Sequence, residues 1–216
     1  MTPELVCTVD DDQSMRRSLQ RLLKSAGYSA EIFASAEDYL AREVFDGPSC
    51  LVLDVRMPGL NGLGLQEALE PRGAGEQIIF LTGHGNVPTC KQAMRKGAVD
   101  FLVKPFDDVE LLGAVQRALG RSEDFLRKRA ERREARERIN KLTPREFEVL
   151  RFVITGLLNK QIAAELQTAE KTIKVHRGRA MQKLGASSVP DLVRLTQRAG
   201  IAPAIPSHPR QARVSA

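Results

Sequence analysis

The sequence has no apolar segment long enough to cross a membrane. Although 42% of its residues are hydrophobic, no apolar run approaches the roughly 18 residues of a transmembrane helix. The first residues, Met1-Thr2-Pro3-Glu4, lack the basic and then apolar pattern of a secretory signal peptide. We therefore expect a cytoplasmic protein with no membrane partner and a core of ordinary size.

Cysteine is scarce, with three residues in a chain of 216. Cys7, Cys50 and Cys90 are odd in number, and their spacing matches no zinc-ligand pattern. Cys7 and Cys50 lie in segments that are typical of strands. We expect reduced, mostly buried thiols rather than disulfides or a zinc site.

Positive and negative side chains are unevenly distributed along the chain, whose formal net charge is +6. Residues 1–120 contain 12 Lys and Arg against 17 Asp and Glu, whereas residues 121–216 contain 21 against 10. An acidic first half and a basic second half predict two domains with different partners. The basic half is expected to bind a polyanion.

Short apolar runs alternate with helical periodicities over the first 120 residues. The runs at residues 50–53 and 78–81 are continuously apolar, which is typical of strands buried on both faces of a parallel sheet. We predict a doubly wound α/β fold with five parallel strands. The expected strands and helices, in chain order, are 4–9, 14–26, 30–33, 35–44, 50–53, 62–69, 78–81, 87–96, 99–103 and 109–119.

Polar residues stand where the predicted strands end. Asp54 follows the run at residues 50–53, a place where open α/β sheets bind ligands, although a single Asp there also suits a helix cap or turn. Parallel strands bring their carboxyl ends to one edge of the sheet, so further polar side chains should gather around it. Those at the other strand ends are Asp10, Asp11, Thr82 and Lys104.

Crowded carboxylates repel one another unless a cation is present. Ligands that are all oxygen favour a hard ion, and Mg²⁺ is usual where phosphate is handled. Asp54 is able to act as a nucleophile that forms an acyl phosphate, while Lys104 and Thr82 offer a charge and a hydroxyl to phosphoryl oxygens. The turn at Pro58 should bring the carbonyl of Arg56 towards the metal.

These motifs resemble the receiver domain of two-component response regulators over about residues 3–120. The resemblance implies a flavodoxin-like fold and phosphorylation of Asp54 by a partner sensor histidine kinase. It implies Mg²⁺ held by Asp11, Asp54 and the Arg56 carbonyl, with Asp10 acting through water. The motifs are Asp10-Asp11, Asp54-Val55-Arg56-Met57-Pro58-Gly59, Thr82-Gly83-His84-Gly85 and Asp100-Phe101-Leu102-Val103-Lys104-Pro105-Phe106.

The same resemblance implies contacts of Thr82 and Lys104 with the phosphoryl oxygens. It implies that Phe101 is a switch residue that turns inward when Thr82 moves, although Phe101 also suits a plain core position. It further implies a cis peptide between Lys104 and Pro105. We expect Asp12 to be a solvated residue at a helix start, and His84 a loop residue beside the site.

Residues 121–141 contain nine Lys and Arg, five Asp and Glu, and neither Pro nor Gly. Opposite charges three and four residues apart favour a solvated helical linker, touching DNA phosphates or a second protomer; a flexible charged linker is the alternative. Its apolar residues are too sparse for a coiled coil. Residues 201–216, with Pro203, Pro206 and Pro209, are expected to form a disordered tail.

Residues 142–200 predict a compact domain of four helices. Thr143-Pro144-Arg145-Glu146 has the N-cap, first-turn proline and acidic residue of a helix start, and that helix should run to Gly156. Asn159 is expected to cap a second helix, residues 160–166. Residues 170–184 and 188–199 form the third and fourth. The two helices joined at residues 167–169 match a helix-turn-helix.

The third helix has an apolar side and a basic side when wound at 100° per residue. Such a helix fits the major groove of DNA, although a solvated surface is the alternative. His176 should be a hydrogen-bonded structural residue. Arg177 should pack its stem and send its charged end to a phosphate. The predicted DNA-binding residues are Lys160, Lys171, Thr172, Lys174, Val175, Arg177 and Arg179.

Residues 138–200 resemble a LuxR-type DNA-binding domain, and the whole chain is similar to FixJ/NarL-type response regulators. That implies dimerisation on phosphorylation, binding to double-stranded promoter DNA, and RNA polymerase as a further partner. Gly178 departs from the family pattern because it offers no side chain for base contact. The motifs are Leu142-Thr143-Pro144-Arg145-Glu146, Asn159-Lys160-Gln161-Ile162-Ala163, Thr172-Ile173-Lys174-Val175-His176 and Met181-Gln182-Lys183-Leu184.

Two other functions compete with a phosphorylation-switched transcription factor. A phosphatase with an aspartyl nucleophile needs a second Asp two residues after the first, where this chain has Arg56. A DNA-binding protein whose receiver is inactive is the other alternative. Such a protein would not need the full set of polar residues at the strand ends, and this chain has all of them. We therefore predict a regulator rather than an enzyme.

Overall fold

The computed structural model describes residues 4–72, 75–83 and 87–206. The chain divides into two compact units, Met1–Arg127 and Lys128–Ala216. The expectations for His84 and for residues 207–216 lie outside the described residues. Within the described ranges, no helix is long and apolar enough to span a bilayer.

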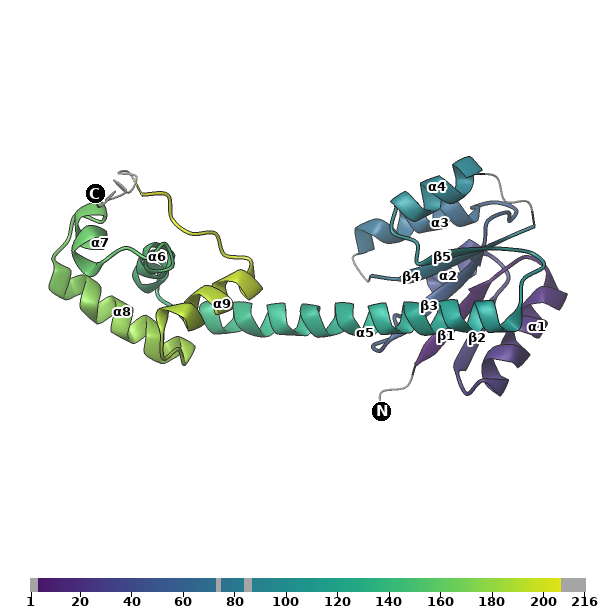
Figure 1. Cartoon of the computed structure of the whole chain (residues 1–216), viewed down its shortest axis with the longest axis horizontal. Coiled ribbons are helices and arrows are strands. Elements are labelled where there is room, and N and C mark those ends of the chain that lie inside the picture. The colour runs from purple at the N-terminus through teal and green to yellow at the C-terminus, as the bar shows by residue number, and fades with distance from the viewer. Residues whose placement is uncertain (1–3, 73–74, 84–86, 207–216) are drawn as a thin grey trace, which may run out of the picture. The chain divides into compact units, whose positions relative to one another are not determined.

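The first unit is a parallel sheet with helices on both faces (Figure 1). Its five strands have the order β2-β1-β3-β4-β5, and every neighbouring pair is parallel. This is the predicted doubly wound fold. The elements are β1 Leu5–Val9, α1 Gln13–Ser25, β2 Ser29–Phe33, α2 Ala36–Ala41, β3 Ser49–Asp54, α3 Gly62–Leu69, a 3₁₀ turn Glu70–Arg72, β4 Gln77–Thr82, α4 Val87–Arg95, β5 Asp100–Val103 and the start of α5 Asp108–Ile139.

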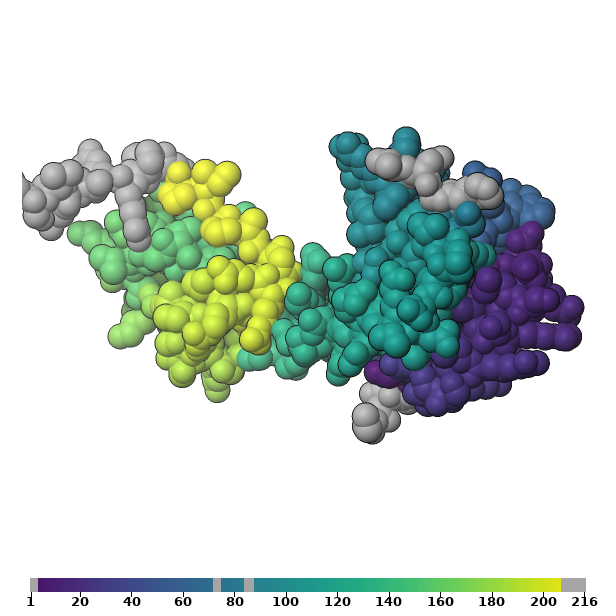
Figure 2. All heavy atoms as spheres, turned by 45° about the vertical axis from the view of Figure 1, so that its right-hand side comes forward, coloured from purple at the N-terminus to yellow at the C-terminus, as the bar shows by residue number. Residues whose placement is uncertain are grey.

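Two apolar cores lie on opposite faces of the sheet because side chains alternate along each strand. Leu51 and Leu53 of β3 face the core under α2, α3 and α4, whereas Cys50 and Val52 face the core under α1 and α5. The surface of α5, in teal, accordingly lies beside that of α1, in purple (Figure 2). Both faces of β3 are buried, as its unbroken apolar run predicts.

The three cysteines are free, and Cys7 and Cys50 are buried in these cores. Burial raises the pKa of the Cys7 thiol to about 12. It raises the pKa of Cys50 as well. Both side chains therefore remain protonated and pack as small apolar groups.

The second unit contains four helices and the end of α5. The helices are α6 Pro144–Val153, α7 Asn159–Glu165, α8 Glu170–Leu184 and α9 Val189–Ala199. Thr143 and Glu146 form the predicted capping box at the start of α6, and Gly185 ends α8 in the left-handed conformation. Their apolar sides enclose one core, which includes Leu150, Ile162 and Ile173.

Two helix ends differ from the sequence prediction. Helix α2 ends at Ala41 instead of 44, because Arg42 is extended and turns its guanidinium onto the Tyr39 ring at 4.4 Å and towards Glu76 at 3.2 Å. Asn159 does not cap α7. Leu158 holds the N-cap position, and its backbone N–H donates to the side chain of Gln161.

The predicted linker is helical, but its last turns are not simply solvated. Ala135 and Ile139, four residues apart on one side of α5, are buried in the core of the second unit. Arg136 donates to the carbonyl of Ala199 at 3.0 Å, and Arg138 donates to that of Leu184. These carbonyls end α9 and α8 and have no partner within their own helices. Both arginines therefore serve as helix caps rather than as free linker charges.

Residues 201–206, the described part of the tail that was expected to be disordered, have no regular secondary structure but contact α6. Arg151 of α6 donates from Nε to the carbonyl of Ala202 at 3.1 Å and from Nη2 to that of Pro203 at 3.4 Å. Its own carbonyl accepts from the N–H of Ala204 at 3.0 Å. A composition rich in proline predicts disorder, but three hydrogen bonds to one arginine hold this segment against α6.

Candidate functional site

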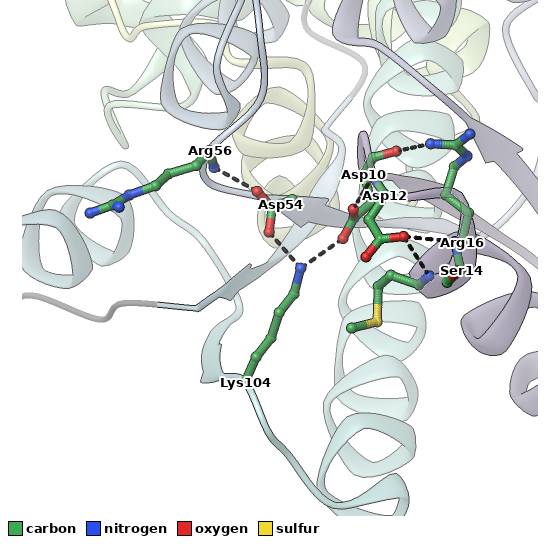
Figure 3. Close-up of polar contacts among 8 residues, drawn as sticks. Asp10, Asp12, Ser14, Arg16, Asp54, Arg56 and Lys104 are labelled. Atoms are coloured by element: carbon green, nitrogen blue, oxygen red, sulfur yellow. Dashed lines mark hydrogen bonds and ion pairs between the residues drawn. The ribbon is translucent and has the colours of Figure 1, made fainter.

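Asp54 is the last residue of β3 and lies at the carboxyl edge of the sheet in the first unit (Figure 3). It is 6% exposed. Its Oδ2 accepts from the backbone N–H of Arg56 at 2.7 Å, and its Oδ1 accepts from Nζ of Lys104 at 2.7 Å. A Cβ at Gly62 would lie 2.3 Å from the Asp54 carbonyl oxygen, so α3 begins against this strand end only because residue 62 is glycine.

Asp10 lies beside Asp54 because β1 pairs with β3 and places Val9 opposite Leu53. Asp10 is 1% exposed. Its Oδ2 accepts from the same Lys104 Nζ at 2.8 Å. One ammonium group therefore joins two buried carboxylates that come from two adjacent strands (Figure 3).

Burial and pairing act in opposite directions on these groups. Burial raises the pKa of Asp54, and the hydrogen bond from Lys104 only partly offsets that rise. Burial by itself would lower the pKa of Lys104, but its hydrogen bonds to Asp10 and Asp54 outweigh burial and raise the pKa. Lys104 is therefore firmly protonated at neutral pH and supplies the positive charge of the site.

The predicted carboxylates are only partly brought together. Asp11 is exposed, while Asp10 and Asp54 are buried. No group of three Asp, Glu, His or Cys side chains in the described part of the chain is arranged to hold a metal ion. The two buried carboxylates nevertheless converge on one point, occupied by the Lys104 ammonium. Two convergent carboxylates and an exposed third are an oxygen-only donor set that suits a hard ion retaining several waters.

The other predicted residues of this site lie on β4 and β5. Thr82 is the last residue of β4 and is 2% exposed, and its carbonyl accepts from the N–H of Lys104 at 2.7 Å. Phe101 is half-buried, with its ring centroid 6.2 Å from that of Phe80. The peptide between Lys104 and Pro105 is cis. Thr82 ends β4 and Lys104 directly follows β5, as predicted, whereas Phe101 is the second residue of β5.

The loop after β1 contains a contact that the sequence reasoning missed. Arg16 of α1 donates from Nη1 to the backbone carbonyl of Asp10 at 2.5 Å (Figure 3). Asp12 caps α1, because its side chain accepts from the N–H groups of Ser14 and Met15. A basic residue one turn inside the helix that follows an acidic strand end was the available signal.

Helix α8 presents the predicted DNA-binding side chains of the second unit. Val175 is 44% exposed, and Lys171, Lys174, Gly178 and Arg179 are exposed as well. Lys160 of α7 is also exposed, and Thr172 is half-buried. The opposite side of α8 is buried through Ile173, Ala180 and Leu184. The helix thus has the apolar back and basic front that winding the sequence predicts.

Two side-chain contacts hold α8 against its neighbours. Arg177 donates from Nη1 to Oδ1 of Asn159 at 3.0 Å, which joins α8 to the start of α7. Lys183 donates to Oε2 of Glu146 at 2.7 Å, which joins α8 to α6. The expected hydrogen bond of His176 is not found at its Nδ1, a buried atom with no partner among the described residues.

Two family models match the chain. Residues 6–116 match the response regulator receiver domain. Residues 140–196 match the bacterial regulatory proteins of the luxR family. The two matches fall in the first and second unit respectively, in the order that the motifs predict.

Curated relatives match over nearly the whole chain. Nodulation protein W of Bradyrhizobium diazoefficiens is 48% identical over 202 residues, covering 93% of this chain and 88% of that protein. Transcriptional regulatory protein FixJ of Azorhizobium caulinodans is 44% identical over 199 residues, covering 92% and 94%. Both alignments are therefore long enough to extend over both units of this chain.

Solved structures of response regulators are also similar to this chain over most of its length. The structure of response regulator StyR is 42% identical, with a TM-score of 0.77, and the match covers 91% of this chain and 99% of that one. Full-length FixJ from B. japonicum is 40% identical, with a TM-score of 0.55, covering 93% and 98%.

Proposed function

This chain belongs to the response regulators, as a transcription regulator with a receiver domain and a LuxR-type DNA-binding domain, and we propose that phosphorylation of Asp54 switches its binding to DNA. The family implies a sensor kinase and promoter DNA as partners. We assign the phosphoacceptor to Asp54 because its carboxylate ends a buried strand and shares the Lys104 ammonium with Asp10.

In the proposed reaction, an oxygen of Asp54 bonds to phosphorus as the bond from phosphorus to a kinase histidine nitrogen breaks. That nitrogen keeps the electron pair. Asp11, Asp54 and the carbonyl of Arg56 would hold Mg²⁺, with Asp10 acting through water; the bound ion would neutralise charge on the phosphoryl group. Lys104 and the hydroxyl of Thr82 would bind the phosphoryl oxygens.

The output of this reaction is a change on the receiver surface. Movement of Thr82 towards the phosphoryl group would leave room for Phe101, which is half-buried in this structure, to turn inward. We propose that the resulting receiver dimer places two α8 helices on a near-palindromic promoter site. There the cytoplasmic regulator would act on RNA polymerase.

The competing enzymatic function lacks the residue it needs. A phosphatase that uses an aspartyl nucleophile requires an acid two residues after it, and this chain has an exposed Arg56 there. A guanidinium cannot replace that carboxyl group, because arginine has no acceptor oxygen and does not release a proton in proteins. The similarity to transcriptional regulatory protein FixJ of Azorhizobium caulinodans supports the same choice.

The test is phosphorylation by a small phosphodonor in the presence of Mg²⁺, followed by intact-mass measurement. Asp54→Asn should abolish incorporation because an amide is not a nucleophile, while Asp46→Asn, at an exposed position of the same unit, should incorporate phosphate like the wild type. Undiminished incorporation in Asp54→Asn would show that the phosphoacceptor is another residue.

A further inference from the structure

The loop that carries Asp10 and Asp11 is anchored by a side chain from the next helix. Nη1 of Arg16 lies 2.5 Å from the backbone carbonyl oxygen of Asp10 (Figure 3). This carbonyl belongs to the peptide that connects Asp10 to Asp11. Arg16 is half-buried, and its backbone N–H bonds to the carbonyl of Asp12 as part of α1, so its position is set by the helix.

Two shorter-range bonds hold the rest of this loop. The N–H of Asp12 donates to Oδ1 of Asp10 at 2.8 Å, and the N–H of Ser14 donates to Oδ1 of Asp12 at 2.7 Å. The first bond closes a turn around the Asp10–Asp11 and Asp11–Asp12 peptides, and the second joins this turn to the start of α1. Neither bond engages the carbonyl oxygen of the Asp10–Asp11 peptide, which the Arg16 guanidinium holds.

Asp11 depends on that anchor more than its neighbours do. The carboxylates of Asp10 and Asp12 both accept hydrogen bonds, whereas the exposed Asp11 carboxylate accepts none from the described residues. The direction in which an exposed side chain leaves the chain is set mainly by the backbone on either side of it. Arg16 also binds a backbone oxygen and no carboxylate of this loop, so the side-chain oxygens of Asp11 stay available.

We propose that Arg16 is a positioning residue that fixes the Asp10–Asp11 peptide and so directs the Asp11 carboxylate towards a divalent cation. The proposal rests on the proposed function, in which Asp11 is a ligand of that ion. Residues that orient metal ligands typically contribute a 10- to 100-fold effect on metal affinity, and one backbone anchor belongs at the lower limit of that range, about 10-fold.

The main test is calorimetric titration of the full chain with Mg²⁺. Arg16→Ala should weaken Mg²⁺ binding by about 10-fold, and Arg16→Lys, whose ammonium can reach the same carbonyl, should restore part of the loss. Arg17→Ala is the matched control, because Arg17 is the neighbouring, exposed arginine of the same helix. It should bind Mg²⁺ like the wild type.

A second measurement needs no metal. Without the anchor, the loop should open more often, so the amide of Asp12, which is bonded to Asp10 in the structure, should exchange its hydrogen faster in Arg16→Ala than in Arg17→Ala. Phosphorylation of Arg16→Ala should require more Mg²⁺ yet approach the wild-type rate at saturation, because only the binding of the ion is weakened.

The outcomes separate the two proposals. If Arg16→Ala unfolds more easily but keeps the wild-type Mg²⁺ affinity and Asp12 exchange rate, Arg16 merely stabilises α1 and the inference is overturned. If the wild type itself neither binds Mg²⁺ nor becomes phosphorylated at Asp54, the proposed function fails instead. If Arg16→Ala is too unstable to titrate with Mg²⁺, Arg16→Lys provides the test. The exchange rate of its Asp12 amide must lie between those of Arg16→Ala and the wild type.

Discussion

Lys104 and Asp54 form an ion pair across the carboxyl edge of the sheet, with Nζ 2.7 Å from Oδ1. The lysine lies directly after β5 and the aspartate ends β3, so β4 separates their strands. The same ammonium also pairs with Asp10 at 2.8 Å. Phosphorylation of Asp54 would change the charge and shape of the partner that Lys104 binds, and Lys104 is thus placed to sense it.

We predict that Lys104→Ala still binds Mg²⁺ and still accepts phosphate on Asp54, but no longer dimerises when phosphorylated. Removing the ammonium leaves the carboxylates free for the metal while removing the group that binds the phosphoryl oxygens. Mass measurement and sedimentation of the same samples separate the two effects. Lys24→Ala, an exposed lysine of α1, is the control. Normal dimerisation of phosphorylated Lys104→Ala would exclude Lys104 as the sensor.

A second prediction separates base contacts from phosphate contacts in the second unit. Lys174→Ala should weaken binding to the specific site by on the order of 1–3 kcal/mol and relax one base position, because α8 presents Lys174 on its exposed basic side. Lys160→Ala on α7 should weaken specific and random DNA equally and make the salt dependence shallower.

The measurement is a pair of titrations, with specific and random duplex, over several salt concentrations. Lys160→Ala serves as the matched control, because it removes the same charge from the neighbouring helix. Equal weakening of both duplexes by Lys174→Ala would show that α8 does not contact base edges at this residue.

A third prediction concerns where the DNA-binding unit begins. A fragment of residues 128–206 should be more stable to urea than one of residues 142–206 by at least about 2 kcal/mol, the usual cost of losing a buried isoleucine. The longer fragment keeps Ile139 in the core and the bonds of Arg136 and Arg138 to the ends of α9 and α8. Equal urea midpoints would mean that α5 adds nothing to this fold.

A fourth prediction is a pH dependence. Hydrogen bonds from Lys183 and from the backbone of Thr143 hold the pKa of Glu146 below its ordinary value. A carboxyl with a lowered folded-state pKa stabilises the fold above its unfolded pKa, and that contribution is lost as pH falls through the lowered pKa. Acidification should therefore weaken the second unit.

The variant that tests this is Glu146→Gln, which keeps the shape but removes the charge. It should cost about 1 kcal/mol near pH 7, a modest figure because Lys183 is partly exposed to screening solvent. The difference from the wild type should shrink as the pH falls through the lowered pKa of Glu146. Urea unfolding of residues 128–206 over a series of decreasing pH values measures it, and a constant difference would contradict the assignment.

The sheet and its polar edge were predictable from the sequence because their signals are local. The unbroken apolar run of β3 indicates burial on both faces, and parallel strands bring their ends together, which is why Asp10, Asp54 and Lys104 were expected as neighbours. The same periodicity placed Lys174 and Val175 on the exposed side of α8. None of these inferences needs knowledge of a contact partner.

Most of the features that were missed depend on contacts between residues far apart in the chain. Arg138 bonds to Leu184, 46 residues away, and nothing near either residue indicates it. Residues 201–206 have a composition typical of disorder, yet Arg151 holds them. Arg16 is the exception, because its bond to the Asp10 carbonyl spans only six residues, and a basic residue one turn inside the helix after an acidic strand end was the local signal for it.

Gly178 provides no side chain on the exposed side of α8, and there is room for one. A Cβ there would meet no atom within 4 Å, and replacing a glycine inside a helix gains roughly 0.5–1 kcal/mol. Position 178 is therefore open to mutation in a way that most functional positions are not, since a new side chain needs no compensating change elsewhere. If α8 enters the groove as proposed, a lineage that carries this chain is able to acquire a different operator preference in one substitution while its fold becomes more stable.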